Sequence, residues 1–197
     1  MSTIPNRTLV LGSTSVYRRE LLERLRLPFE VVAPLVDETA RPGETPHQVA
    51  YRLAMDKARE VAARYPTAVV IGSDQVADLG GLPLGKPGDH RRATLQLRQM
   101  RGRTVVFQTA VAVVCLQTGF AETDLAAVVV RFRDFGDDEI ETYLQAEKPY
   151  DCAGSAKSEG LGIAMLESID SDDPSALVGL PLIRTCRLLR AAGLTIP

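Results

Sequence analysis

The feature that most constrains the fold is a continuous apolar run at residues 68–72 (AVVIG), which lies between two helical patterns. An uninterrupted apolar run of this length predicts a central strand, because a strand covered on both faces carries apolar side chains on both sides. Residues 8–12 and 29–33 predict two more short strands. Residues 16–27 and 46–65 predict helices, because apolar side chains recur there every three or four positions. The alternation predicts an α/β fold.

The second half of the chain predicts a sheet with antiparallel strands as well. Two β-rich runs, residues 104–116 and 123–133, are separated by a short turn segment and predict a long hairpin. Residues 80–88 contain too many glycines and prolines for regular structure, so we expect a loop there. We expect one α/β domain, residues 1–197, with a mixed central sheet flanked by helices. The remaining elements expected are helices at 89–100 and 137–147, a loop-rich segment at 149–174 and a closing helix at 175–192.

Composition excludes several classes of protein. The 197 residues carry 23 Lys and Arg against 25 Asp and Glu, so no global charge attracts nucleic acid or acidic membranes, and we expect no stable nucleic-acid partner. The apolar runs are shorter than the roughly 20 residues that span a bilayer, and the N-terminal segment lacks a signal-peptide pattern. Three scattered cysteines and two histidines show no zinc-site spacing. These features predict a soluble cytoplasmic protein.

The first strand leads into a glycine and hydroxyl residues at the start of a helix, GSTSVYRR. Free backbone N–H groups and the positive end of the helix dipole meet there, which predicts an anion site near Ser13. Arg18 and Arg19 lie in the first helical turn, where they oppose the helix dipole unless an anion compensates. The alternative is an ordinary Ser/Thr helix cap with two solvated arginines.

Acidic residues follow two of the predicted strands. The central apolar run leads into Ser73, Asp74 and Gln75, and the carboxyl end of a strand is where ligands bind in open α/β sheets. Asp37 and Glu38 follow the strand at 29–33 in the same way. Carboxylates that converge on a phosphate ligand suit Mg²⁺. The alternatives are a turn aspartate and a solvated acidic loop.

Lys57 lies on the apolar stripe of its predicted helix, four residues from both Leu53 and Val61. A lysine at such a position must extend to the surface, pair with an acid or face a cleft. The first of these is the alternative to a functional role.

Residues 80–86 match the first part of a phosphate-binding GxxxxGK loop. The match fails at Pro87, where that loop needs a hydroxyl side chain and a backbone N–H. We therefore reject a P-loop nucleoside triphosphatase and retain Lys86 as a candidate phosphate contact.

Residues 152–162 (CAGSAKSEGLG) combine three glycines with Ser and Lys, as a ligand-binding wall does, although a pair of structural turns has the same composition. Cys152 in this segment is a conceivable nucleophile without an obvious partner base. Neither histidine lies near a serine that would form a Ser/His/Asp triad.

Taken together, the motifs GSTSVYRRELL, VDE, RLAMDKA, IGSDQV, GKP, CAGSAKSEGLG and DPSALVGLPL span nearly the whole chain. In this order they resemble the Maf-like nucleoside-triphosphate pyrophosphatases. The resemblance implies a mixed-sheet α/β fold of two lobes with a cleft, a divalent cation (Mg²⁺ or Mn²⁺) and commonly a homodimer. It also implies hydrolysis of a nucleoside triphosphate to the monophosphate and pyrophosphate.

The resemblance also implies roles for individual residues. Asp74 takes the place of the proton acceptor, and it shares the metal with Glu38. The groups placed around the phosphates and the metal are Ser13, Arg18, Glu38, Lys57 and Lys86. Val16 departs from the family, which usually has a proline there, but a proline would only preset the first helical φ angle.

Base preference within the family is implied by Tyr17, Gln75 and Glu159, which resemble the branch that hydrolyses 7-methyl-GTP. A carboxylate such as Glu159 accepts the N–H groups of the guanine edge, and an aromatic face such as Tyr17 attracts the cationic methylated ring. Tyr17 departs mildly from the expected tryptophan. The alternatives are the dTTP/UTP branch, which tends to carry arginine, threonine and glutamine at these positions, and a non-catalytic nucleotide-binding regulator linked to cell division.

Overall fold

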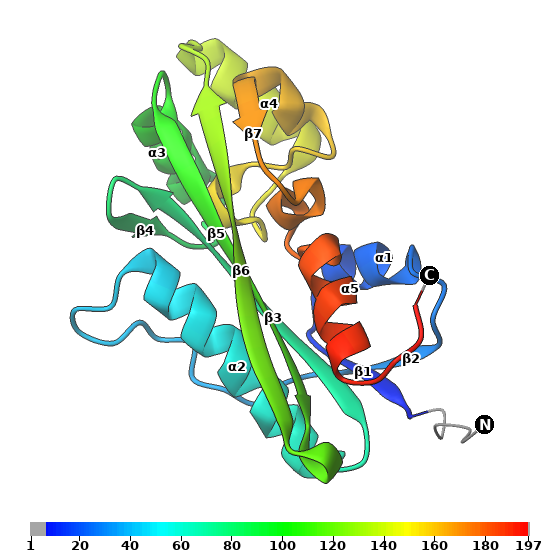
Figure 1. Cartoon of the computed structure of the whole chain (residues 1–197). Helices are drawn as coiled ribbons and strands as arrows, with labels where there is room; N and C mark the ends of the chain where they lie inside the picture. Colours follow the sequence, from blue (N-terminus) through cyan, green and yellow to red (C-terminus); the bar gives the residue numbers. More distant parts are fainter. Residues whose placement is uncertain (1–6, 197) are drawn as a thin grey trace.

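The computed structural model describes residues 7–196, and its centre is a seven-stranded mixed sheet (Figure 1). The strand order is β2-β1-β3-β5-β6-β7, with β4 paired to β3. β1 pairs in parallel with β2 and β3, and every other pairing is antiparallel. The predicted mixed α/β sheet is therefore confirmed. The strands are β1 Leu9–Gly12, β2 Phe29–Val32, β3 Val69–Leu79, β4 Leu82–Leu84, β5 Thr104–Cys115, β6 Phe120–Phe132 and β7 Leu166–Asp170.

Five α-helices and four short 3₁₀ helices pack against this sheet in the described part of the chain. None of these helices has both the length and the apolar character needed to cross a bilayer. The prediction that the N-terminus carries no signal-peptide pattern rests in part on residues 1–6, which lie outside the described range. The helices are α1 Val16–Glu23, α2 Pro46–Arg64, α3 His90–Met100, α4 Asp137–Glu147, α5 Leu182–Ala191, η1 Leu116–Thr118, η2 Ala153–Ser155, η3 Leu161–Met165 and η4 Pro174–Val178.

The molecule has two lobes that share the long strands (Figure 1). In one lobe, α2 covers one face of the sheet, and α1 and α5 cover the other, each with its own buried apolar cluster. In the second lobe, α3 and α4 pack on the far ends of β3, β5 and β6 around a third cluster. This arrangement agrees with the two lobes that the family resemblance implies.

The central strand is longer than its apolar run predicts. We expected the strand to end at Gly72 and Asp74 to lie just beyond it, but β3 continues through Asp74 to Leu79. The reason is its antiparallel pairing with β5, which holds in register as far as Asp78 opposite Val106. Asp74 therefore lies within the sheet, and its position is fixed by the pairing with β5, where it lies opposite Ala110.

Three other expectations were wrong in part. The segment 80–88 is not all loop: Gly80 and Gly81 adopt positive φ angles (65° and 92°) and form a tight turn, so that β4 pairs back onto β3. The expected helix at 175–192 is divided. The 3₁₀ helix η4 ends at Gly179 (φ 120°), and α5 begins only after Pro181. Strand β7 also lies inside the segment expected to be loop-rich.

Helix α2 lies in direct contact with β3 at Gly72. A Cβ at Gly72 would lie 2.2 Å from the carbonyl oxygen of Ala54 and 2.6 Å from the nitrogen of Ala58, so only glycine permits this approach. The helix begins at a capping box in which Thr45 and Gln48 satisfy each other's backbone N–H groups. The close contact at Gly72 brings Lys57 of α2 beside Asp74 of β3.

Candidate active site

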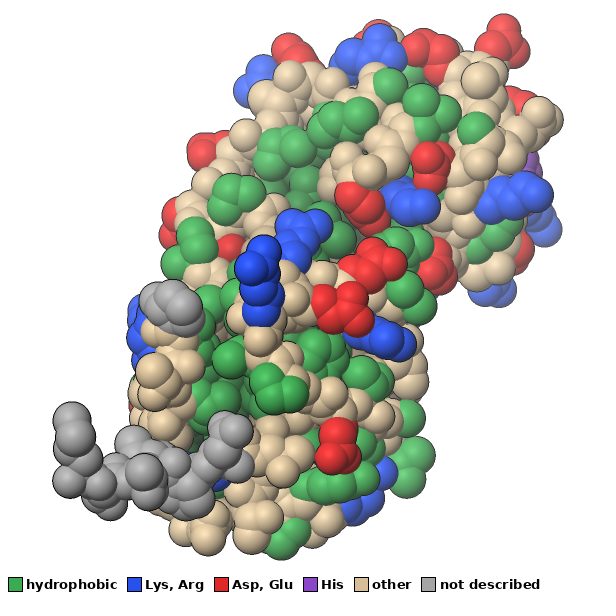
Figure 2. Space-filling view, turned by 90° about the vertical axis from the view of Figure 1, so that its right-hand side faces the viewer, with side chains coloured by type: hydrophobic (Ala, Val, Ile, Leu, Met, Phe, Trp, Pro, Cys, Tyr) green, Lys and Arg blue, Asp and Glu red, His purple; other side chains and the backbone are tan. Residues whose placement is uncertain are grey.

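A cleft of about 740 Å³ lies between the two lobes. Figure 2 shows basic and acidic side chains gathered at the junction of the lobes. Arg19 does not line the cleft; its guanidinium forms an exposed ion pair with Glu23 at 2.9 Å. The predicted site residues that do line it are Ser13, Tyr17, Arg18, Glu38, Lys57, Asp74, Gln75, Lys86 and Glu159.

Lys57 lies between two carboxylates at the centre of this cleft. Its ammonium is 2.7 Å from Asp74 Oδ1 and 2.8 Å from Glu38 Oε1. Lys57 is 4% exposed and Asp74 is 7% exposed, whereas Glu38 extends into the open cleft. Burial by itself would raise the pKa of Glu38, but the hydrogen bond and the charge of Lys57 outweigh it and lower that pKa. Of the three fates predicted for Lys57, the structure shows pairing inside a cleft.

Arg18 and Ser13 lie together on one side of the cleft, at the segment where an anion site is predicted. Arg18 Nε donates to the carbonyl of Gly179 at 2.8 Å, and Nη1 donates to Ser13 Oγ at 3.4 Å. Burial lowers the pKa of Arg18, and the charges of Asp74 and Glu38 partly oppose that shift. Ser15 is the N-cap of α1, so the capping interpretation of this segment is correct for Ser15. Arg18 is only partly exposed and is hydrogen-bonded to Gly179 and Ser13, so it is not the freely solvated arginine of that alternative.

Gln75 is held by the loop that contains η4. Its Nε2 donates to the carbonyls of Ala176 and Leu177 at 2.9 and 3.0 Å and lies 3.0 Å from Thr109 Oγ1. The Thr109 hydroxyl donates to the carbonyl of Ala176 at 2.9 Å and is completely buried. Because these contacts occupy the amide nitrogen, the amide oxygen of Gln75 is the atom left to bind a ligand in the cleft.

Tyr17, Cys152 and Glu159 also line the cleft. The Tyr17 hydroxyl donates to Asp151 Oδ1 at 3.4 Å. Burial raises the pKa of the Tyr17 phenol, and the neighbouring Cys152 adds to the rise. Burial also raises the pKa of the Cys152 thiol to about 12, so the thiol is protonated at neutral pH. Nothing in these surroundings activates Cys152 as a nucleophile.

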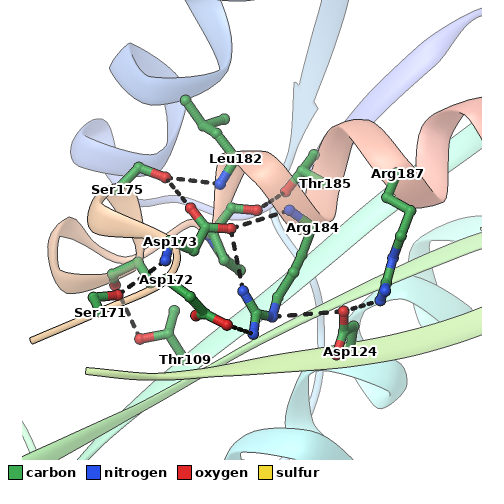
Figure 3. Close-up of polar contacts among 12 residues, drawn as sticks. Thr109, Asp124, Ser171, Asp172, Asp173, Ser175, Leu182, Arg184, Thr185 and Arg187 are labelled. Atoms are coloured by element: carbon green, nitrogen blue, oxygen red, sulfur yellow. Dashed lines mark hydrogen bonds and ion pairs between the residues drawn. The ribbon is translucent and has the colours of Figure 1, made fainter. Parts of the chain in front are cut away.

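Asp173, which no local pattern in the sequence singled out, supports the η4 loop (residues 174–179) on the side away from the cleft. Figure 3 shows Arg184 of α5 extending toward Asp124, Asp172 and Asp173. The completely buried Asp173 accepts the backbone N–H of Arg184 at 3.0 Å and the hydroxyl of Ser175 at 2.9 Å. These contacts hold the carbonyls that bind Arg18 and Gln75. Local pattern gave no signal for Thr109 either, and the signal for Asp173 was its place in the family motif DPSALVGLPL.

Comparison with known proteins shows the family to which the chain belongs. Residues 8–192 match the model of the family described as Maf-like protein. The chain belongs to the Maf-like family. A protein of Polaromonas sp. named 7-methyl-GTP pyrophosphatase is 72% identical over 98% of this chain and 89% of its own length. Proteins of the same name from Albidiferax ferrireducens and Ralstonia nicotianae are 69% and 58% identical, over 100% and 92% of this chain and 98% and 94% of their own lengths.

The carboxylates of this Maf-like chain suit a metal ion only together with a ligand. Among the described residues, no group of three or more His, Cys, Asp and Glu side chains is arranged to hold a metal by itself. Mg²⁺ is commonly bound by one or two carboxylates, water and the phosphates of a substrate. Glu38 and Asp74, which share one ammonium, offer two such carboxylates within reach of a single cation. The donor set therefore fits a divalent ion that binds with a triphosphate.

Proposed function

We propose that this Maf-like protein hydrolyses 7-methyl-GTP to 7-methyl-GMP and pyrophosphate. The observation that carries the proposal is the buried Lys57–Asp74 pair beside Arg18 and Ser13, because it combines a base with cationic groups in one cleft. Water adds to the α-phosphorus, and the bond from that phosphorus to the oxygen bridging to the β-phosphorus breaks. Pyrophosphate leaves with the electron pair of that bond.

Asp74 accepts the proton of the attacking water in this proposal. The ammonium of Lys57 holds Asp74 Oδ1 at 2.7 Å, and a carboxylate within hydrogen-bond reach of the attacking water can take its proton. Lys57, Lys86 and Arg18 stabilise the negative charge that grows on the phosphates during bond cleavage. Lys86 lies exposed on the loop after β4, on the other lobe, and a bound triphosphate would bring it close to the others.

Glu38 and Asp74 are the residues we propose to hold a divalent cation, Mg²⁺ or Mn²⁺. Such an ion neutralises phosphate charge and polarises the phosphorus–oxygen bonds when it is bound. Lys57 already lies on both carboxylates, so the ammonium must share them with the ion when substrate arrives.

The base end of the cleft suits a methylated guanine. The Glu159 carboxylate and the amide oxygen of Gln75 are acceptors, and the Watson–Crick edge of guanine presents N–H donors. Methylation at N7 makes the purine cationic, so the face of Tyr17 attracts it more strongly than it attracts unmethylated guanine. The dTTP/UTP branch is the second candidate within the family, but Tyr17, Gln75 and Glu159 stand where it tends to carry arginine, threonine and glutamine, respectively.

The cellular setting is part of the proposal. Three free cysteines, Cys115, Cys152 and Cys186, fit a reducing compartment such as the cytoplasm. A homodimer, which the family resemblance implies, would be detected as a doubled mass in analytical ultracentrifugation.

The experiment that tests the proposed activity compares the wild-type protein with Asp74→Asn. Pyrophosphate release from 7-methyl-GTP should fall roughly 10²- to 10⁴-fold, as expected for loss of a general base. Binding of 7-methyl-GTP, measured by calorimetry, should survive. Unchanged release would remove Asp74 from the reaction, and release from no nucleotide by the wild type would favour the non-catalytic regulator instead.

A further inference from the structure

Glu147, the last residue of α4, holds both ends of the turn that carries Glu159. Its Oε1 accepts the backbone N–H of Leu161 at 2.8 Å, and its Oε2 lies 3.0 Å from the ammonium of Lys157. These two partners lie two residues after and two residues before Glu159. Glu147 itself does not line the cleft.

The turn is shaped to receive this carboxylate. A Cβ at Gly160 would lie 2.6 Å from Glu147 Oε1, so the carboxylate occupies the space that any other side chain at position 160 would need. A Cβ at Gly162 would lie 2.5 Å from the carbonyl oxygen of Lys157. The two glycines of the KSEGLG segment are thus explained by close packing around Glu147 and Lys157.

The same ion pair reaches the second residue of the base site. The ammonium of Lys157 lies 5.9 Å from the centre of the Tyr17 ring, on one of its faces. The N–H of Leu161 and the charge of Lys157 lower the pKa of Glu147, so its carboxylate is ionised at neutral pH and neutralises Lys157. Without that neutralisation, an unpaired cation on one face of Tyr17 would weaken the attraction of its other face for a cationic base.

We infer that Glu147 is a positioning residue for base selection: it fixes Glu159 at the guanine edge and neutralises the lysine that lies on Tyr17. The inference rests on the proposed function, because it concerns the choice among nucleotides at the same site. Glu147 touches neither substrate nor reacting atoms, so it acts only through Glu159 and Tyr17.

Two ratios of kcat/KM separate this role from a merely structural one. The ratio of GTP to UTP reports on Glu159, because uracil does not present the guanine edge and neither base is cationic. The ratio of 7-methyl-GTP to GTP reports on Tyr17, because only the methylated base is cationic. A variant that only loosens the fold lowers kcat/KM for all three nucleotides by one common factor and leaves both ratios unchanged.

The test measures both ratios for wild type, Glu147→Gln and Lys157→Met. Gln keeps an acceptor for Leu161 but loses the charge that neutralises Lys157, so we expect both ratios to fall about three- to tenfold. Lys157→Met removes the cation from Tyr17, so it should leave the 7-methyl-GTP to GTP ratio at or above the wild-type value. Adding Glu147→Gln to Lys157→Met should then leave that ratio unchanged, because the two act through one pair. In a Glu159→Gln background, Glu147→Gln should leave the ratio of GTP to UTP unchanged.

Glu141→Gln is the matched control, since Glu141 is an exposed carboxylate of the same helix that pairs with His90, away from the cleft. It should leave both ratios as in the wild type. Equal losses for all three nucleotides in Glu147→Gln would overturn the inference and leave the proposed function intact. A wild type that cleaves 7-methyl-GTP no better than UTP and GTP would overturn the proposed function, and the inference with it. If Glu147→Gln does not fold, Lys157→Met is the deciding variant. A fall in its ratio of kcat/KM for 7-methyl-GTP to kcat/KM for GTP contradicts the inference.

Discussion

Lys57 and Asp74 form a buried ion pair where α2 lies against β3, with Nζ 2.7 Å from Oδ1 and side chains only 5% and 10% exposed. Taking two charges out of water is costly, and a protein that keeps such a pair offsets the cost through close hydrogen-bonded geometry. Here the geometry depends on Gly72, which lets the helix approach the strand closely enough for the two charges to meet. The pair therefore connects the packing of the sheet to the proposed chemistry.

Breaking this pair should destabilise the fold as well as the activity. Lys57→Met leaves the buried Asp74 carboxylate without its ammonium, which should lower the free energy of unfolding by about 3–5 kcal/mol. Adding Asp74→Leu should recover part of that loss, because the unpaired charge is then gone. Urea unfolding of both single variants and the double variant measures the coupling; strictly additive losses would show that the two charges do not stabilise each other.

Divalent metal should be required for turnover. We expect pyrophosphate release with Mg²⁺ or Mn²⁺ and none after EDTA treatment, because Glu38 and Asp74 offer oxygen ligands of the kind these ions prefer. Glu38→Gln should raise the Mg²⁺ concentration that gives half-maximal activity, since one charged ligand is lost. Full activity in chelator would exclude the metal from the reaction.

Base selection should respond to Glu159 and Tyr17 in different ways. Glu159→Gln places an N–H against an N–H of guanine, which should cost about 1–3 kcal/mol, or roughly ten- to a hundredfold in kcat/KM for 7-methyl-GTP. The same change should alter kcat/KM for UTP little, because uracil offers acceptors as well as a donor. Tyr17→Ala should narrow the gap between 7-methyl-GTP and GTP. If neither variant changes the ranking of substrates, these residues do not choose the base.

Asp173 should support the cleft from a distance. Asp173→Asn replaces a buried carboxylate that accepts hydrogen bonds from Ser175 and from the backbone of Arg184. The free energy of unfolding should therefore fall by about 1–3 kcal/mol. Because Gly179, which caps η4, binds Arg18 and the carbonyls of η4 bind Gln75, kcat/KM should fall too. Thermal unfolding together with steady-state kinetics tests this. A variant with wild-type stability and kinetics would show that the loop is held by other contacts.

Local pattern was sufficient to predict part of this site. Lys57 shares a helical stripe with Leu53 and Val61, and that spacing alone required the lysine to extend to the surface, pair or face a cleft. The Gly-Ser segment before Arg18 likewise predicted an anion site, and the structure brings Arg18 to Ser13. Arg19, one residue along the same helix turn, points to a different partner, Glu23, which charge type alone does not distinguish.

Non-local pairing accounts for what the pattern missed. The apolar run ends at Gly72, but β5, some 40 residues further on, extends β3 through Asp74. Asp173 accepts a hydrogen bond from the backbone of Arg184 and so supports the η4 loop. The carbonyl of Ala176 in that loop binds Gln75, which lies about 100 residues earlier in the chain. The break between η4 and α5 had a local signal in Gly179 and Pro181, which the expectation of one closing helix overlooked.

The most direct test of the account is a panel of nucleoside triphosphates, with pyrophosphate measured for each under the same Mg²⁺ concentration. The wild-type protein should cleave 7-methyl-GTP with a kcat/KM well above those for GTP, dTTP and UTP, and release one pyrophosphate for each 7-methyl-GMP formed. Equal or better cleavage of dTTP or UTP would contradict the assignment of Tyr17, Gln75 and Glu159 to a methylated guanine. Release of single phosphates instead of pyrophosphate would contradict attack at the α-phosphorus itself.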